Sequence, residues 1–148
     1  MPSPLYNRDI LRLAAGIPHL GPLAGAQARA ERRSALCGSR VAVEVRLDEQ
    51  GRIAALGQEV SACALGQASA ALMGAHAPGR DSAELARACD ELRAFLHGRR
   101  EDPGTWPGLG VLAAARPYPA RHASILLPFE AVAEAAALAG TAPISAAE

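Results

Sequence analysis

Hydrophobic and polar residues alternate most regularly between residues 40 and 48, in the segment RVAVEVRLD. The positions on one face are aliphatic: Val41, Val43, Val45 and Leu47. The positions on the other face are charged or small: Arg40, Ala42, Glu44 and Arg46. This alternation indicates an antiparallel strand with one buried face. The segment EQG is typical of a turn and RIAALGQEV of a returning strand, so residues 39–60 are predicted to form a hairpin.

Helical spacing of apolar residues dominates the segments around this hairpin. Residues 5–15 place four apolar side chains on one helical face: Leu5, Ile10, Leu11 and Leu13. The following GIPHLGPLAG stops that helix, and the polar AQARAERR is either a helix or a solvated link. After the hairpin, residues 61–77 predict a helix of small residues with Ser61 as its N-cap.

The second half of the chain is predicted to be helical with one long interruption. Residues 82–97 form an amphipathic helix capped by Asp81 or Ser82, with an apolar stripe made of Leu85, Cys89, Leu92 and Leu96. HGRREDPGTWPG is an exposed loop, and residues 108–116 are helical up to Pro117. The segment ASILLPFEAVAEAAALAG predicts a final helix that continues past Pro128 and ends at Gly140.

The order helix, hairpin, then helices predicts an α+β fold in which helices pack on one face of a small antiparallel sheet. We expect one domain over residues 1–148, ordered over about residues 5–140, with a frayed tail at residues 141–148. The length of 148 residues is enough to bury a core of ordinary size.

Composition excludes several classes of function. Fifteen basic and fifteen acidic residues cancel, and only five residues are aromatic, which argues against nucleic-acid binding. All the basic residues are arginine, so a Schiff-base lysine or a lysine-bearing phosphate loop is excluded, and the arginine, alanine and glycine bias suggests a bacterial genome. We expect no apolar run near the roughly 20 residues of a membrane span and no secretory signal, which makes the cytoplasm the default location.

The candidate chemistry lies in three cysteines, too few and too uneven in number for a disulfide framework. Cys89, on a helical stripe, is expected to be a buried structural residue. Cys63 lies between a strand and a helix, where it is either a thiolate favoured by the helix N-terminus or a small packing residue. Cys37 lies in the turn ALCGSR and is a metal ligand, a sulfur nucleophile or an inert apolar residue. The hairpin should bring Cys37 and Cys63 together, and two thiols at one sheet end hint at a metal site.

Four segments in this order resemble a known protein family: LYNRDILRLAAGIPHLGPL, LCGSRVAVEVRLDEQGRI, VSACALGQASAALM and YPARHASILLPFEA. They resemble the iron–sulfur cluster assembly scaffolds of the IscU, SufU and NifU N-terminal type, over nearly the whole chain and closest to the SufU branch. The resemblance implies three cysteines and one aspartate that hold zinc or a nascent iron–sulfur cluster, with Cys37 and Cys63 as the first two cysteines. It also implies a cysteine desulfurase of the SufS/IscS type as partner and Cys37 as the acceptor of persulfide sulfur.

The sequence departs from the family pattern at the ligand positions. Ser39 replaces the aspartate, and Ala62 replaces the glycine before the second cysteine. The third cysteine is replaced by Ala123 or by Ser124, depending on which flanking motif sets the match. His122 resembles a histidine of the IscU branch and is a candidate substitute ligand, although a lone histidine at a helix entry is more often structural. The ligand set is thus degenerate: Cys37, Cys63 and tentatively His122.

Three functional hypotheses follow. In the first, the protein is a scaffold or sulfur acceptor that works with a cysteine desulfurase, as a carrier rather than as a turnover enzyme. In the second, it is a metal-free family member that modulates the desulfurase or the authentic scaffold by protein–protein contact. In the third, Cys37 and Cys63 act as a redox pair unrelated to iron. The sequence leaves open the metal, the partner and the oligomeric state.

Overall fold

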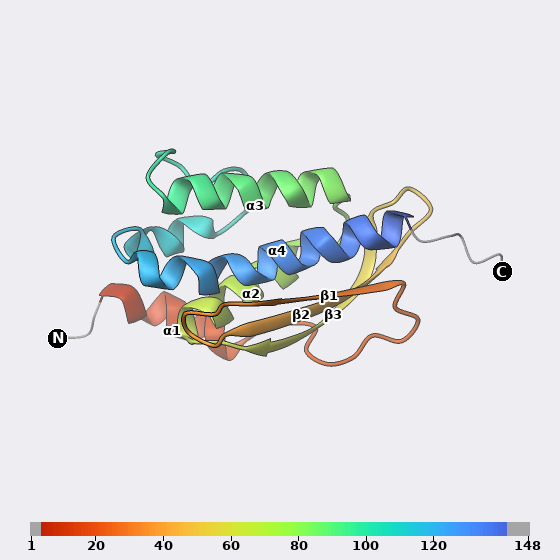
Figure 1. Cartoon of the computed structure of the whole chain (residues 1–148), viewed down its shortest axis with the longest axis horizontal. Helices are drawn as coiled ribbons and strands as arrows, with labels where there is room; N and C mark the ends of the chain where they lie inside the picture. Colours follow the sequence, from red (N-terminus) through yellow and green to blue (C-terminus); the bar gives the residue numbers. More distant parts are fainter. Residues whose placement is uncertain (1–3, 142–148) are drawn as a thin grey trace.

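The computed structural model describes residues 4–141, drawn in Figure 1. A short 3-10 helix, η1 (Pro4–Tyr6), precedes helix α1 (Arg8–Ala15) and three strands, β1 (Ala28–Arg33), β2 (Arg40–Leu47) and β3 (Ile53–Ser61). Helices α2 (Ala64–His76) and α3 (Ser82–Leu96), the 3-10 helix η2 (Leu109–Ala115) and helix α4 (Pro119–Thr141) follow. The predicted tail lies outside the described residues apart from Thr141, which closes α4.

The predicted hairpin is confirmed as β2 and β3, which pair antiparallel from Arg40 opposite Ser61 to Leu47 opposite Ile53. Val41, Val43 and Val45 are completely buried, as their alternation requires. A register shift between Arg46 and Leu47 marks the far end of β2, where Leu47 is only partly buried. The alternation therefore identified both the strand and the face that packs on the core.

The segment AQARAERR contains a third strand, β1, so its prediction as a helix or solvated link is wrong. β1 pairs antiparallel with β2 and forms one edge of the sheet in the order β1-β2-β3. Its buried side is built only from alanine, with Ala30 buried against the core, so the usual β-branched signal is missing. Pairing with β2 decides the conformation, and the exposed arginines suit a sheet edge.

The helices cover one face of the sheet, as predicted. In Figure 1, helices α2 and α4 lie directly over the strands, and α3 lies on the far side of α4. Helix α4 contacts β1, β2, α2 and α3, which makes it the centre of the molecule. This helix is long and apolar enough to span a membrane by length and composition alone, contrary to our expectation from the sequence. However, 56% of its most apolar stretch is buried inside the domain, as in an ordinary core helix.

Several element boundaries differ from the prediction for local reasons. Ser61 is the last residue of β3, so Cys63, not Ser61, is the N-cap of α2. Leu11 is 52% exposed although Ile10 is fully buried, because adjacent residues of a helix project about 100° apart. Asp81 caps α3 in a reciprocal pair with Glu84, which confirms one of the two predicted caps.

The segment between α3 and η2 is less exposed than predicted, because Trp106 is buried. Its indole N–H donates to the carbonyl of Leu72, and its ring meets Phe129 edge-on. The indole thus attaches the loop to helices α2 and α4. A single large aromatic side chain buries enough apolar area to order a polar loop of this kind.

Candidate functional site

Cys37 lies in the turn between β1 and β2, at one end of the sheet. The turn is closed by two backbone hydrogen bonds, from Ser34 N–H to the Ser39 carbonyl and from Gly38 N–H to the Ser34 carbonyl, both 2.9 Å. Gly38 has a φ of +72°, a conformation that glycine adopts without strain. The side chain of Cys37 is exposed in this turn. A thiol in this position is open to a reaction partner.

Cys63 approaches the same end of the sheet from the other strand of the hairpin. It follows β3 by two residues and is the N-cap of α2, in an extended backbone conformation. Because Arg40 lies opposite Ser61, the chain that enters β2 and the chain that leaves β3 are neighbours. Cys63 is partly buried, whereas Cys37 is exposed.

Two serine hydroxyls connect the two thiols. The Cys37 thiol donates to Ser39 Oγ at 3.1 Å, and Ser39 Oγ lies 3.3 Å from Ser124 Oγ. Ser124 Oγ lies 3.4 Å from the sulfur of Cys63. Both serines are buried, at 4% and 1% exposure. We call these four residues (Cys37, Ser39, Ser124 and Cys63) the cysteine–serine cluster.

The sequence offered Ala123 and Ser124 as replacements for the third cysteine of the family. Ser124 is the one that joins the cysteine–serine cluster. Ser124 is fixed beneath helix α2, because a Cβ added to Gly66 would lie 2.5 Å from Ser124 Oγ. Glycine at position 66 therefore permits this approach. Ala123, the other candidate, is partly exposed and contributes only a methyl group.

The surroundings of Cys37 favour its thiolate. Hydrogen bonding from the Ser34 hydroxyl, and then from Ser39, lowers the pKa of Cys37, and the nearby cation of Arg121 acts in the same direction. Ser34 Oγ is buried and has no partner at good hydrogen-bond geometry among the described residues, so it remains free to donate to a thiolate. Neither Ser34 nor Arg121 was predicted from the sequence as part of the site. Only the position of Ser34 within the same turn could have suggested it.

His122, the tentative third ligand, makes no hydrogen bond to the cysteine–serine cluster among the described residues. Its Nε2 contacts the carbonyls of Ala115 and Arg116 at 3.0 and 3.1 Å. Successive helical residues are about 100° apart, so His122 and Ser124 leave α4 on different sides. Within residues 4–141, no three His, Cys, Asp or Glu side chains come together as a metal site.

The donor atoms of the cluster do not fit the metal centre implied by the family resemblance. A tetrahedral zinc site or a [2Fe–2S] cluster is held by four thiolate, imidazole or carboxylate ligands. The cluster offers two thiols and two hydroxyls, and a neutral hydroxyl is a weak ligand for either group. The arrangement suits hydrogen bonding to a sulfur anion better than metal coordination.

Cys89 is a structural thiol, as its place on the helical stripe predicted. It is 5% exposed in the core, and burial raises its pKa to about 11. The only side chain that donates to it among the described residues is Arg93, at 3.5 Å. Its sulfur is therefore unreactive at neutral pH.

Comparison with solved structures places this geometry among known proteins. A NifU-like protein (N-terminal) from Brucella abortus superposes with a TM-score of 0.88 at 35% identity, covering 93% of this chain and 96% of that chain. A candidate iron–sulfur cluster assembly scaffold for the SUF system from the thermophile Fervidobacterium islandicum AW-1 superposes with a TM-score of 0.81 at 21% identity, covering 89% and 96%. No protein-family model and no curated protein matches the chain.

Proposed function

The chain belongs to the IscU/SufU/NifU family of iron–sulfur cluster assembly scaffolds, and from this premise we propose that it accepts sulfur on Cys37 from a cysteine desulfurase. The observation that carries the proposal is the exposed Cys37 thiol, whose pKa is lowered by the surrounding hydroxyls. Sulfur acceptance needs one reactive thiolate, whereas cluster assembly needs a full ligand set. The substitutions at the ligand positions spare the first requirement and remove the second.

The proposed transfer is an exchange between two sulfur anions. The Cys37 thiolate attacks the outer sulfur of a persulfide on the desulfurase, and the sulfur–sulfur bond of the donor breaks. The donor cysteine leaves as a thiolate, and Cys37 carries the persulfide. No external oxidant or reductant is consumed, because one sulfur–sulfur bond replaces another.

The remaining residues of the cluster would support this step without a metal. Ser39 lies within hydrogen-bond distance of Cys37 and can donate to it once the thiol is ionised. Arg121 adds a nearby positive charge. Zinc or an iron–sulfur cluster is not required by any step of this proposal, and the cytoplasm is its proposed location.

The test is sulfur transfer from a purified SufS-type desulfurase supplied with free cysteine. Mass spectrometry of the intact protein should detect one added sulfur atom, and peptide mapping should place it on Cys37. The Cys37→Ser variant should remain unmodified, and the Cys89→Ala variant should be modified like the parent. Modification of Cys63 alone, or none in the parent, would refute the proposal.

A second candidate function is metal-free modulation of the desulfurase or of an authentic scaffold through protein contact. It is favoured by the lack, among residues 4–141, of any three metal-binding side chains in one place. In that case the Cys37→Ser, Cys63→Ser double variant would still change desulfurase turnover as the parent does. Loss of the effect with Cys37 would instead favour sulfur acceptance.

A further inference from the structure

The cysteine–serine cluster contains a second thiol, Cys63, which sulfur acceptance on Cys37 does not use. The antiparallel register pairs Arg40 with Ser61. Counting two residues outward from this pair reaches Cys63 on one chain and Gly38, the neighbour of Cys37, on the other. Opposite residues of antiparallel chains have Cα atoms about 5 Å apart, and a disulfide joins residues whose Cα atoms are about 4.4–6.8 Å apart. This placement brings the two cysteines into the range that a disulfide spans.

Three hydrogen bonds connect the two sulfurs of the cluster in one line. When the sulfur on Cys37 is an anion it only accepts, so Ser39, 3.1 Å away, donates to it. A serine hydroxyl has one hydrogen to donate, so Ser39 in turn accepts from Ser124, and Ser124 accepts from the Cys63 thiol. All the hydrogens then point the same way. The chain can therefore carry a proton from Cys63 toward the sulfur on Cys37.

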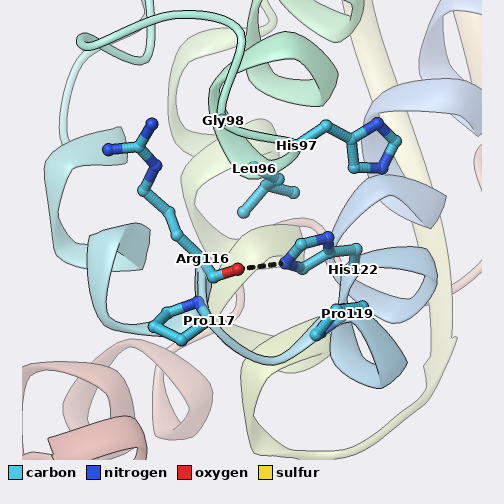
Figure 2. Close-up of a pocket in the computed structure, with 7 residues that line it drawn as sticks. All are labelled: Leu96, His97, Gly98, Arg116, Pro117, Pro119 and His122. Atoms are coloured by element: carbon cyan, nitrogen blue, oxygen red, sulfur yellow. Dashed lines mark hydrogen bonds between the residues drawn. The ribbon is translucent and has the colours of Figure 1, made fainter.

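No imidazole competes with the serines for this proton. His122 lies two residues before Ser124, but its Nε2 is 3.0 Å from the carbonyl of Ala115 and 3.1 Å from that of Arg116. Figure 2 shows the His122 ring bonded to the Arg116 carbonyl, in a cavity of about 620 Å³ between α3 and α4. Among the described residues, Ser124 is the only side chain that forms a hydrogen bond with the sulfur of Cys63.

The position of the serines also determines which sulfur of a persulfide Cys63 reaches. The Cys37 sulfur, 3.1 Å from Ser39, becomes the inner sulfur of the persulfide and remains next to the cluster. The outer sulfur is added on the side of an exposed thiol, with an open route to solvent. Attack from the cluster is therefore directed at the inner sulfur, and the outer sulfur is the leaving group.

We propose that Cys63 resolves the persulfide on Cys37 and releases the transferred sulfur as sulfide, an activity that rests on the proposed sulfur acceptance. The sulfur of Cys63 attacks the inner sulfur, and the bond between the inner and outer sulfurs breaks. The outer sulfur leaves as hydrosulfide with the proton that Cys63 passes through Ser124 and Ser39. A Cys37–Cys63 disulfide forms. The two cysteine sulfurs are oxidised and the transferred sulfur is reduced, so the step consumes no external oxidant or reductant.

The test is a chase that follows the loading of Cys37. The protein is loaded briefly and anaerobically with a purified SufS-type desulfurase and free cysteine, and both are then removed by gel filtration. The intact mass of the parent should lose the added sulfur atom and end two hydrogen atoms below that of the unloaded protein. An equal amount of sulfide should appear in solution, and peptide mapping should find the Cys37–Cys63 disulfide.

The decisive variant is Cys63→Ser, which should load on Cys37 and then keep its persulfide. Its sulfide release should be slower than that of the parent by about a hundredfold or more, because an intramolecular nucleophile is lost. Serine is a preferred N-cap residue, so this substitution should preserve helix α2. Cys89→Ala, which removes the buried thiol outside the cluster, is the matched control and should release sulfide like the parent.

Failure of this inference can be told apart from failure of sulfur acceptance. If Cys37 does not accept sulfur, neither the parent nor Cys63→Ser gains mass during loading, and both proposals fall. If both proteins load and then lose sulfur at the same rate, only the resolving role of Cys63 is overturned. A disulfide that joins two copies through Cys37, in place of the internal bond, would also overturn it.

The proton route has its own readout. Ser124→Ala, loaded to completion first, should release sulfide about tenfold more slowly at pH 7, the effect of losing one proton-transfer group. The difference should shrink at alkaline pH, where hydroxide removes the thiol proton directly. Ser69→Ala removes a buried hydroxyl outside the cluster and should release sulfide like the parent. A deficit in Ser124→Ala that is equal at every pH would overturn the proton route.

Discussion

Cys37 and Cys89 carry the same thiol in opposite environments. Cys37 lies in an exposed turn, surrounded by the hydroxyls of Ser34 and Ser39, which lower its pKa. Cys89 lies in the core, where burial raises its pKa to about 11 and Arg93 compensates only in part. The difference shows that an exposed turn with hydrogen-bond donors makes a cysteine thiol reactive by favouring its thiolate. Burial on the apolar face of a helix makes the same thiol unreactive by disfavouring the thiolate.

The largest expected effect comes from completing the ligand set around Cys37. The double change Ser39→Asp, Ser124→Cys should raise zinc affinity on the order of a thousandfold, because Ser124 is the residue that lies between Ser39 and Cys63. Structural zinc sites bind with roughly 10–16 kcal/mol shared among four ligands. Competition with a chromogenic chelator measures the affinity. Added zinc should also raise the melting temperature of the double variant.

Two comparisons control this experiment. Adding Cys89→Ala to the double variant should leave the zinc affinity unchanged, because Cys89 lies outside the cluster. Using Ala123→Cys in place of Ser124→Cys should restore less, because Ala123 is partly exposed and lies outside the cysteine–serine cluster. Zinc binding no tighter than that of the parent would show that the inherited ligand geometry is absent.

Alkylation of the native protein should separate the two thiols by about a hundredfold or more. Cys89 has a pKa of about 11 and that of Cys37 lies below 9.0, so at pH 7 their thiolate fractions differ by at least about two powers of ten. The rate at Cys37 should rise with pH along a titration curve whose midpoint lies below pH 9.0, because the pKa of Cys37 is lowered. Iodoacetamide labelling followed by peptide mapping measures both rates, and equal labelling would contradict the assignment of Cys89 to the core.

Removal of the Ser34 hydroxyl should slow alkylation of Cys37 by about three- to tenfold at pH 7, the effect of one hydrogen bond to a partly exposed charge. The pH profile of alkylation should move to higher pH in Ser34→Ala, because the Ser34 hydroxyl is the main cause of the lowered pKa of Cys37. Ser69→Ala removes a buried hydroxyl that donates to the Ile125 carbonyl, and it should leave the profile in place. A profile that is unchanged in Ser34→Ala would leave Ser39 and Arg121 as the source of the shift.

The smallest effect is expected at Cys89. Cys89→Ala should cost about 1 kcal/mol of unfolding free energy at pH 7 through lost packing. Folding raises the pKa of Cys89 from 9.0 to about 11. The folded state therefore gains its full stability from the neutral Cys89 thiol below pH 9, and it loses this contribution as the pH rises through about 11. Urea unfolding at pH 7 and pH 10 should therefore show a smaller alkaline loss in Cys89→Ala than in the parent.

The sequence predicted those parts of the fold where local pattern and tertiary packing agree. The alternating valines identified β2, and the cap candidate Asp81 identified the start of α3. Strand β1 was not predicted, because its inward side chains are alanines and its pairing with β2 decides its conformation. Cys63 rather than Ser61 caps α2, because β3 continues to Ser61.

The candidate site was predictable as a meeting of Cys37 and Cys63 but not in its detail. Hairpin geometry brings the two cysteines to one end of the sheet. The choice of Ser124 over Ala123 depends on the rotation of α4 and on its approach to Gly66, which no local pattern encodes. The same rotation directs His122 toward His97, a residue 25 positions earlier in the chain.

Trp106 gives the protein an optical signal that reports on a single place. It is the only tryptophan in the chain, and its indole is buried between Phe129, the edge of His76 and the cation of Arg80. Its emission should therefore be blue-shifted while the loop before η2 is seated and should move to the red when that loop detaches. Fluorescence thus follows the docking of this loop without any added dye, through an indole that makes no hydrogen bond to the cysteine–serine cluster.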